Sequence, residues 1–454
     1  MKRILLTIPV LLAVSCQNYL DVRPQGYVLP TTDEEFATIM HNRIREIEGG
    51  GDEYILGNMD RLLLFEGIAD DLDANIRTGN NLPSYAGEKI NSMQLRYSYF
   101  WETVKDCNIV IGNLSGRSTD LARQTLAAAY AIKGTVYYNM LREYCEPWED
   151  APSQLGLPLV DKFDIYGRPA RASLQDTYEY TLSLFDKSLA LEPEGGLMFF
   201  DKTIVKALKA RLLFWCEQWE DAAALCQEIV RDCGKTITPA SGFEDMIKSD
   251  SPKGEVLAKS HINDSSELDW YFSTIIRYFA SRPASSSLIR LFGDEPEKDV
   301  RYRVSFDSKR MNKKRPECRI RLSEIVLMLA ECDYHLGKSE AALDCLNELR
   351  RNRIEGISDL TKTSLPAVRT GDRIVSDAAG DAITPLLQAI FDERRKELYM
   401  EGDRWFELKR NGRPEWWIIS NGLKYTTKKY LYTAPIYKRD VDLNHEMIQN
   451  EGYE

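Results

Sequence analysis

The sequence predicts an all-α protein built from about four tetratricopeptide-like helical hairpins, which long, loop-rich insertions interrupt. Apolar residues recur at three- and four-residue spacing over several long stretches, and this is the period of an amphipathic helix. Two of these stretches, around Ala210 and Ala330, also share one order of small and apolar positions. Because 43% of the 454 residues are hydrophobic, the chain can bury a large core.

The N-terminus, MKRILLTIPVLLAVSC, predicts an exported and lipid-anchored protein. A basic start precedes an apolar run over residues 4–14, which is too short to span a bilayer but suits a secretory signal. A small residue and Cys16 follow directly, as in bacterial lipoprotein signals, in which the Cys is acylated. An ordinary cleaved signal with an incidental Cys is the alternative. We expect residues 1–15 to be a lipoprotein signal peptide and residues 16–454 to form one domain, tethered through Cys16.

Four segments carry the predicted hairpins. In residues 319–353, IRLSEIVLMLAECDYHLG ends at Gly337, and SEAALDCLNELRRNR then begins a second amphipathic stretch. Two amphipathic helices joined by two or three residues must fold back antiparallel. Residues 201–233 repeat the unit, with a small residue early in the second helix, which is typical of a tetratricopeptide hairpin. We predict two further hairpins at about 121–191 and 381–412.

Long insertions separate these hairpins, whereas a regular tetratricopeptide array places its repeats about 34 residues apart. Loops longer than about 15 residues inside a compact domain are usually functional or disordered. The insertions at about 40–90 and 234–318 combine polar runs with aromatic residues, and we expect them to form the ligand side. Residues 354–380 are polar and have little apolar periodicity.

Charge and cysteine usage argue against several classes of function. A formal net charge of −11 and a pI near 5.2 argue against nucleic acid and against electrostatic attachment to anionic lipid. The nine cysteines and four histidines form no CxxC or HExxH motif, so we expect no metal and no other cofactor. We expect the cysteines after Cys16 to be mainly buried thiols, although their even number also permits disulfides.

The stretch AIFDERRKELYMEGDRWFELKRNG, residues 389–412, interleaves acids and bases at helical neighbour spacing. Glu393 and Glu397 lie one turn apart and could serve a glycosidase, whose two carboxyls lie about 5–5.5 or about 6.5–9.5 Å apart. However, each has an Arg or Lys close by that would keep it ionised, which is wrong for a general acid. We therefore expect a salt-bridged helix that ends at Gly402 and clamps the following DRWFELKR.

Several segments together resemble the SusD/RagB family of outer-membrane nutrient-binding lipoproteins. In the family's order they are CQNYLDVRPQG, YFWETVKDCNIVIGNL, AIKGTVYYNMLREYCEPW, RLSEIVLMLAECDYHLGKSEAALDCLNELRRNR, AIFDERRKELYMEGDRWFELKR and LYTAPIYKRDVDLN. The resemblance runs essentially from end to end. In the closing segment, Tyr437 stands where relatives commonly have a second Pro.

The resemblance implies a SusD-like fold and a non-catalytic subunit on the outer surface of the outer membrane. Such a subunit captures oligosaccharides or polysaccharides and hands them to a TonB-dependent transporter of the SusC type. The hairpins would then be scaffold and transporter contact, while the loops carried on them bind the ligand. A peptide- or glycopeptide-binding subunit on the same fold, and a helical-repeat adaptor that binds only proteins, are the alternatives.

Two loop regions offer the groups that sugar recognition needs, namely rings for the C–H faces and polar groups for the hydroxyls. The candidate ligand residues are Asp71, Asp73, Asn75, Arg77, Asn81, Tyr85, Trp270, Tyr271 and Tyr278. The alternative is that the rings near Trp270 attach the insertion to the scaffold and that Tyr85 plugs a loop. The clustered carboxylates also suggest Ca²⁺, but the EF-hand loop that would support such a site is absent from the sequence.

Overall fold

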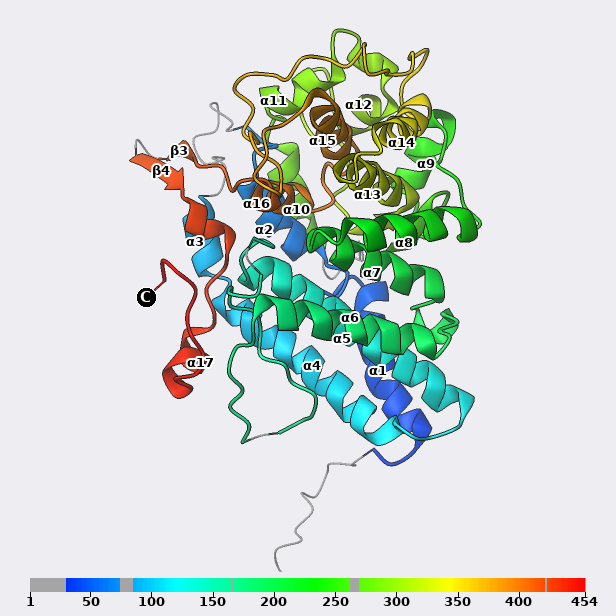
Figure 1. The fold of residues 1–454 in the computed structure, drawn as a ribbon, viewed down its shortest axis with the longest axis vertical. Helices are drawn as coiled ribbons and strands as arrows, with labels where there is room; N and C mark the ends of the chain where they lie inside the picture. Colours follow the sequence, from blue (N-terminus) through cyan, green and yellow to red (C-terminus); the bar gives the residue numbers. More distant parts are fainter. Residues whose placement is uncertain are drawn as a thin grey trace, which may run out of the picture.

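The computed structural model describes residues 30–73, 85–149, 151–164, 166–261, 269–420 and 423–453, with side chains except at 269–272 and 420. Helices dominate these residues, which confirms the predicted all-α class (Figure 1). The α-helices are α1 (Asp33–Glu48), α2 (Met59–Ile68), α3 (Ala86–Asn91), α4 (Gln94–Leu114), α5 (Asp120–Tyr144), α6 (Leu174–Ala190), α7 (Lys202–Trp215), α8 (Trp219–Asp232), α9 (Ala240–Lys248), α10 (Asp269–Ala280), α11 (Ser286–Ile289), α12 (Val300–Ser305), α13 (Leu322–His335), α14 (Ser339–Arg351), α15 (Pro385–Glu397), α16 (Arg404–Arg410) and α17 (Lys438–Leu443).

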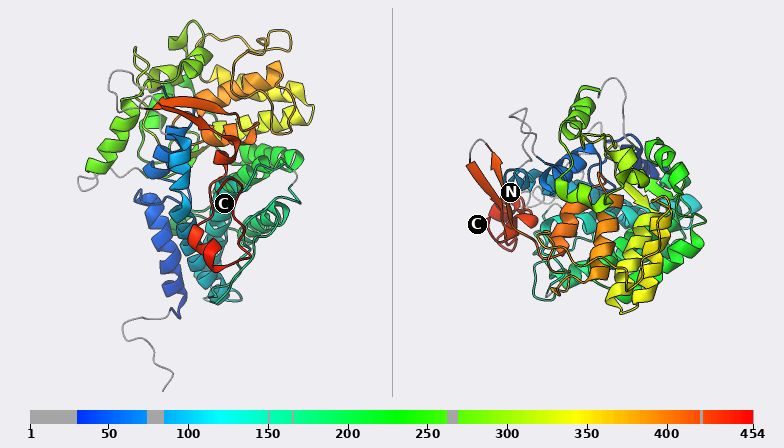
Figure 2. Two further views of the ribbon diagram at one scale, coloured as in Figure 1. Left: turned by 90° about the vertical axis from the view of Figure 1, so that its left-hand side faces the viewer. Right: turned by 90° about the horizontal axis from the view of Figure 1, so that it is seen from above.

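Short strands and 3₁₀ turns complete the described chain. The strands are β1 (Val256–Lys259), β2 (Arg319–Arg321), β3 (Trp416–Ser420) and β4 (Leu423–Thr427), and the 3₁₀ turns are η1 (Gly196–Met198), η2 (Arg290–Phe292), η3 (Pro296–Lys298) and η4 (Lys429–Tyr432). β1 pairs antiparallel with β2, and β3 pairs antiparallel with β4. The β3–β4 hairpin projects from the helical body, as Figures 1 and 2 both show.

Three predicted hairpins form as helix pairs, α5 with α6, α7 with α8, and α13 with α14. The pairs stack in succession, because α6 packs on α7 and α8 packs on α13. The insertion between α8 and α13 therefore loops out of the stack without breaking it. Gly134 marks the closest approach of α5 to α6, since a Cβ atom there would lie 3.0 Å from Cε1 of Phe185.

The fourth predicted hairpin, at 381–412, differs from the other three. α15 packs on α13 and α14, but α16 packs mainly on α2. The prediction that the helix runs on to Gly402 is also wrong, since α15 ends at Glu397. Tertiary hydrogen bonds replace the helical ones here, because Met400 accepts from the Glu317 amide at 3.1 Å and the Gly402 amide donates to Glu66 at 2.7 Å.

The two predicted insertions contain more helix than the sequence indicated. The segment 40–90 includes the end of α1, α2 and α3, and α1 packs along α4 and α5 in the main core. The segment 234–318 includes α9 to α12 and β1. Their apolar residues build satellite cores, of which one joins Leu72 to Ile275 and Phe279 of α10. These local cores hold the insertions in defined positions on the scaffold.

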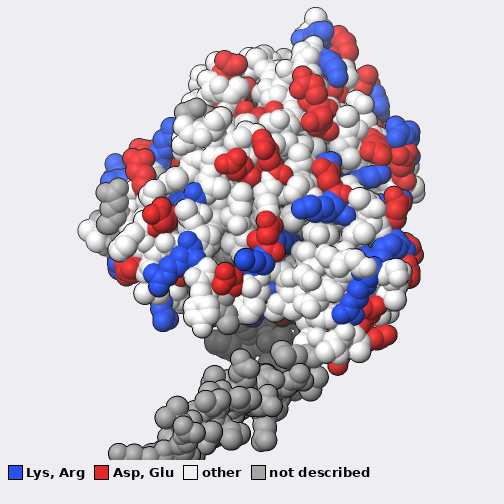
Figure 3. Space-filling model, turned by 60° about the horizontal axis from the view of Figure 1, so that its bottom comes forward, with Lys and Arg blue, Asp and Glu red and all other residues white. Residues whose placement is uncertain are grey.

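The surface and the cysteines agree with a globular protein of mixed charge. On the face that Figure 3 shows, acidic and basic side chains are interspersed without a long run of one sign. In the described part of the chain, no helix has both the length and the apolar character of a membrane span. All eight described cysteines are free, and six of them are buried, as expected for thiols that act as small apolar residues.

Candidate ligand-binding site

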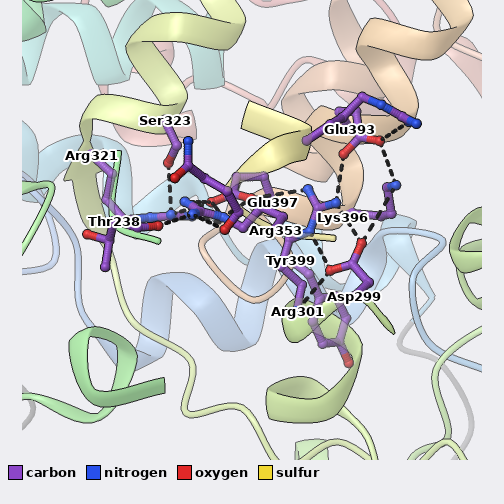
Figure 4. Close-up of polar contacts among 12 residues, drawn as sticks. Thr238, Asp299, Arg301, Arg321, Ser323, Arg353, Glu393, Lys396, Glu397 and Tyr399 are labelled. Carbon is purple, nitrogen blue, oxygen red and sulfur yellow. Dashed lines mark hydrogen bonds and ion pairs between the residues drawn. The ribbon is translucent and has the colours of Figure 1, made fainter. Parts of the chain in front are cut away.

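The charged residues of the C-terminal stretch form a buried ion-pair network (Figure 4). Glu397 is fully buried and accepts from Arg321 at 2.6 Å and from Arg353 at 2.9 Å. Glu393 is 2% exposed and accepts from Arg301 and Lys396, each at 2.7 Å. The salt-bridged helix predicted for this stretch is therefore confirmed, and its distant partners come from α12, β2 and the residues just after α14.

The network leaves neither carboxylate suited to glycosidase chemistry. Burial alone would raise the pKa of Glu393, but Lys396, Arg301 and Arg350 outweigh it and lower the pKa to about 2. Burial likewise opposes the arginines around Glu397, which nevertheless hold its pKa well below its usual range. A general acid needs a raised pKa and access to substrate. Both groups are instead ionised, enclosed and fully occupied in holding distant segments together.

The two regions predicted to carry the ligand lie side by side. Residues 71–73 run antiparallel to residues 283–285, which follow α10, and a β-bridge joins them at Leu72. The amide of Asp73 donates to the carbonyl of Pro283 at 2.8 Å. Segments more than two hundred positions apart in the chain thus meet in one antiparallel pair, residues 71–73 and 283–285, which we call the ridge. Asp71, Leu72, Ala284 and Ser285 are buried in it, and Asp73 reaches the solvent.

The candidate carboxylates on this ridge have different surroundings. Asp71 is 1% exposed, and Arg395 of α15 donates to it at 2.7 Å. Its pKa is raised by burial, against the opposing effect of Arg395. Asp73 lies nearer the solvent and pairs with Arg310 at 3.2 Å. Asp73 is therefore accessible from the solvent, whereas Asp71 is enclosed against Arg395.

The candidate rings fall in two places. Tyr278 is half-buried near the ridge, and the guanidinium of Arg282 lies 3.3 Å from its ring centroid. Tyr85 lies 5.0 Å from Tyr425 of β4, centroid to centroid, so it packs on the β3–β4 hairpin. The other predicted positions lie outside the described residues; they are Cys16, Asn75, Arg77, Asn81 and the side chains of Trp270 and Tyr271.

A cavity of about 190 Å³ adjoins the ridge. Charged and hydroxyl groups dominate its wall, among them Asp70, Ser287, Arg369, Asp372, Arg373 and Arg395. Arg373 exposes 38% of its side chain, pairs with Asp70 at 3.2 Å and lies 4.7 Å from the ring centroid of Trp416. The wall therefore presents hydrogen-bond donors and acceptors that ion pairs and ring contacts hold in place.

The side chain of Asp70 is the fixed acceptor of this wall. Arg404 donates to its two oxygens at 2.7 and 3.0 Å, and Arg395 lies 3.5 Å away. Burial would raise the pKa of Asp70, but Arg395 and Arg404 outweigh it and keep the pKa below its ordinary value. The carboxylate is therefore ionised at neutral pH, and it orients Arg373 at the cavity mouth.

Comparison with known proteins points to one family. Residues 297–453 match the model described as the SusD family. The C-terminal third of the chain therefore carries the SusD family signature. No curated protein matches the sequence.

Solved structures share the SusD fold over nearly the whole chain. A SusD superfamily protein from Bacteroides thetaiotaomicron VPI-5482 has a TM-score of 0.71 at 19% identity, covering 92% of this chain and 100% of its own. A putative sugar binding protein from Bacteroides vulgatus ATCC 8482 has a TM-score of 0.69 at 19% identity, with coverages of 94% and 100%. A laminarin binding SusD-like protein has a TM-score of 0.61 at 16% identity, with coverages of 94% and 100%. At these identities the likeness establishes the fold.

One segment that borders the cavity was not predicted from the sequence to do so. Arg369, Asp372 and Arg373 come from the segment 354–380, which showed little apolar pattern and no aromatic residue. The signal in the sequence was the concentration of charge in RTGDR, residues 369–373, which uncharged residues flank on both sides. Charge density in a loop does not say which cavity the loop will border, because that depends on the packing of α15.

The described side chains form no cluster of the kind that binds a metal ion. Among them, no three His, Cys, Asp or Glu residues are arranged so that they could share an ion. The carboxylates near the ridge are occupied by arginines, as for Asp70 and Asp71. The groups that line the cavity can donate and accept hydrogen bonds.

Proposed function

We propose that this protein is a SusD-family outer-membrane lipoprotein of the cell surface, which captures glycan oligomers and delivers them to a TonB-dependent SusC-like transporter. The observation that carries the proposal is the SusD fold over nearly the whole chain, together with the family match at its C-terminal third. Proteins of this fold are named for sugar, carbohydrate and laminarin binding. Acylation of Cys16 would supply the anchor.

The ligand would bind at the ridge and the neighbouring cavity. This position combines three features that suit a sugar, namely a half-buried ring at Tyr278, oriented arginines at the wall, and an acceptor at Asp73. Since these groups are already held by ion pairs and backbone bonds, little ordering is needed when the ligand binds. The cavity itself would take one sugar residue or part of one, while the rest of an oligomer would lie outside it, beside the exposed end of the ridge at Asp73.

The division of labour between scaffold and loops supports capture and delivery. The stacked pairs from α5 to α14 form a continuous support, and the ion network around Glu397 ties α15 to that support. Such a support can keep the loops in position while the whole subunit moves relative to a transporter. In this proposal the helical pairs contact the transporter and the ridge contacts the ligand.

Binding to a panel of polysaccharides and peptide mixtures tests the proposal, by affinity electrophoresis and by calorimetry. We expect binding to at least one glycan, weakened about tenfold or more in Arg373→Ala, because a hydrogen bond to a charged group is worth roughly 1.5–3 kcal/mol. Arg231→Ala is the matched control, since Arg231 is exposed on α8 and pairs only with its neighbour Asp232 among the described residues.

The alternatives predict different results in the same panel. A peptide receptor would bind peptides and no glycan, and an adaptor would bind neither while still co-purifying with a protein partner. Equal glycan binding by Arg373→Ala and Arg231→Ala would move the site away from the cavity without affecting the family assignment. Labelling with a radioactive fatty acid, lost in Cys16→Ala, tests the anchor separately.

A further inference from the structure

A second cavity, of about 60 Å³, lies between the hairpin scaffold and the C-terminal stretch. α5 and α7 line it on one side, and α15, α16 and the turn between them line it on the other. The residues that matter here are Arg142, Trp215, Arg394, Asp403, Phe406 and Glu407. The cavity is separate from the ridge, and the proposed function does not use it.

Several buried polar atoms at this cavity have no hydrogen-bond partner among the described residues. The donors include Nε of Arg142, Nε1 of Trp215 and Nη1 of Arg394, besides guanidinium nitrogens of Arg319 and Arg410. One is an acceptor, Oε1 of Glu407. Trp215, Arg394 and Glu407 are each at least nine-tenths buried, at 4%, 5% and 3% exposure. Buried polar groups are nearly always satisfied, so an unsatisfied set around one cavity indicates a bound species.

The neighbouring charges explain why donors remain free. The Nε and Nη2 groups of Arg394 donate to Asp403 at 2.8 and 2.7 Å. The Nη1 group of Arg394 is left without a partner among the described residues. The contacts of Arg142 are with neutral groups, since its guanidinium lies 4.2 Å from the ring centroid of Phe406 and donates to Asn139 at 3.3 Å. The positive charge of Arg142 therefore has no direct ion-pair partner in the described chain.

We propose that this cavity binds a small monovalent anion, such as chloride, that joins α5 and α7 to the C-terminal stretch. Each water molecule would bring two hydrogens of its own, and only Glu407 among these orphan atoms could accept one. An anion accepts from every donor and brings no hydrogens, so it satisfies the excess of donors. The cavity volume of about 60 Å³ is sufficient for such an ion, since a cavity of about 10–15 Å³ already holds one water molecule.

Bromide provides a direct test because it substitutes for chloride and scatters anomalously. Crystals grown or soaked in sodium bromide should show an anomalous peak in the cavity, within hydrogen-bonding distance of Trp215 Nε1 or Arg394 Nη1. In solution, Tm should rise with sodium chloride or bromide more than with sodium gluconate at the same ionic strength, because gluconate is too large to enter.

Trp215→Phe removes one donor and keeps an aromatic ring in place. We expect it to weaken the apparent halide affinity about tenfold, because a hydrogen bond to a charged group is lost. Trp219→Phe is the matched control, since Trp219 stacks on His335 outside the cavity and should leave the halide response unchanged. Absence of an anomalous peak in the wild-type protein, or an equal response to gluconate, would overturn the proposal and leave water as the occupant.

Discussion

Replacing Glu393 by Gln tests whether the C-terminal charges are structural. Gln keeps the shape of the side chain but removes the negative charge that faces Lys396, Arg301 and Arg350, at 2.7, 2.7 and 3.1 Å. The pKa of Glu393 falls from its ordinary value of 4.5 to about 2 on folding. A difference of this size corresponds to about 3 kcal/mol of folding free energy, which agrees with the roughly 3–5 kcal/mol typical of breaking a buried ion pair.

The sign of the pH dependence follows from the direction of that pKa. Because the folded-state pKa of Glu393 is depressed, its contribution is fully present above about pH 4.5 and is lost as the pH falls towards about 2. Glu393→Gln should therefore be less stable than the wild type by about 3 kcal/mol at pH 7, and the difference should shrink below pH 4.5. Urea denaturation followed by circular dichroism at several pH values measures both quantities.

Glu340→Gln is the matched control for this experiment. Glu340 is exposed on α14 and pairs with Lys362 at 2.8 Å, a surface contact worth about 0–1 kcal/mol. If Glu393→Gln and Glu340→Gln cost the same, the buried network does not stabilise the fold through its charges. If the wild type released reducing sugar from a glycan and folded Glu393→Gln did not, the carboxylate would be catalytic and its structural role would be refuted.

Three further predictions concern packing, protonation and export. Gly134→Ala should destabilise the protein by about 1–3 kcal/mol in a urea titration, because the added Cβ would lie 3.0 Å from the ring of Phe185. Gly112→Ala is the control, because the Cβ added there meets nothing within 4 Å. Burial and Asp71 raise the pKa of Glu66 to about 8, so wild-type stability should fall as the pH rises from about 4.5 to 8, and Glu66→Gln should remove that fall. A wild-type curve that stays flat over this range would contradict the assignment. Cys16→Ala should release the protein from the outer membrane in cell fractionation, and continued membrane association would argue against an acyl anchor.

The hairpins were predictable because their pattern is local. An apolar face at helical spacing places its residues on one side within a few turns, so α7, α8, α13 and α14 could be read from short windows of sequence. The interleaved charges at Glu393, Arg394 and Glu397 likewise indicated ion pairing, because residues three and four positions apart are neighbours on a helix. The arginines that Glu393 and Glu397 meet from α12, β2 and the residues just after α14 could not be named, because spacing within a helix does not specify which distant segment packs on it.

The proposed ligand region remains a prediction, and the structure shows only how its described segments lie. The sequence pointed to residues 70–85 and 261–282 as separate polar and aromatic loops, and the structure places residues 71–73 directly beside the chain that follows α10. The burial of Asp71 was not foreseen, since an acidic loop residue is normally exposed. It is buried here because Arg395, on a helix more than three hundred positions away, provides the compensating charge.

By itself, the sequence determined the helical class and the positions of three hairpins, and it gave the export signal and the family resemblance as predictions. Each of these depends on residues close together in the chain or on the order of short motifs. Tertiary structure alone decided where α15 stops, which arginines enclose Glu397, and how three separate loops border one cavity. The physical reason is that charge compensation and close packing act between atoms that touch, and contact between distant segments exists only once the chain has folded.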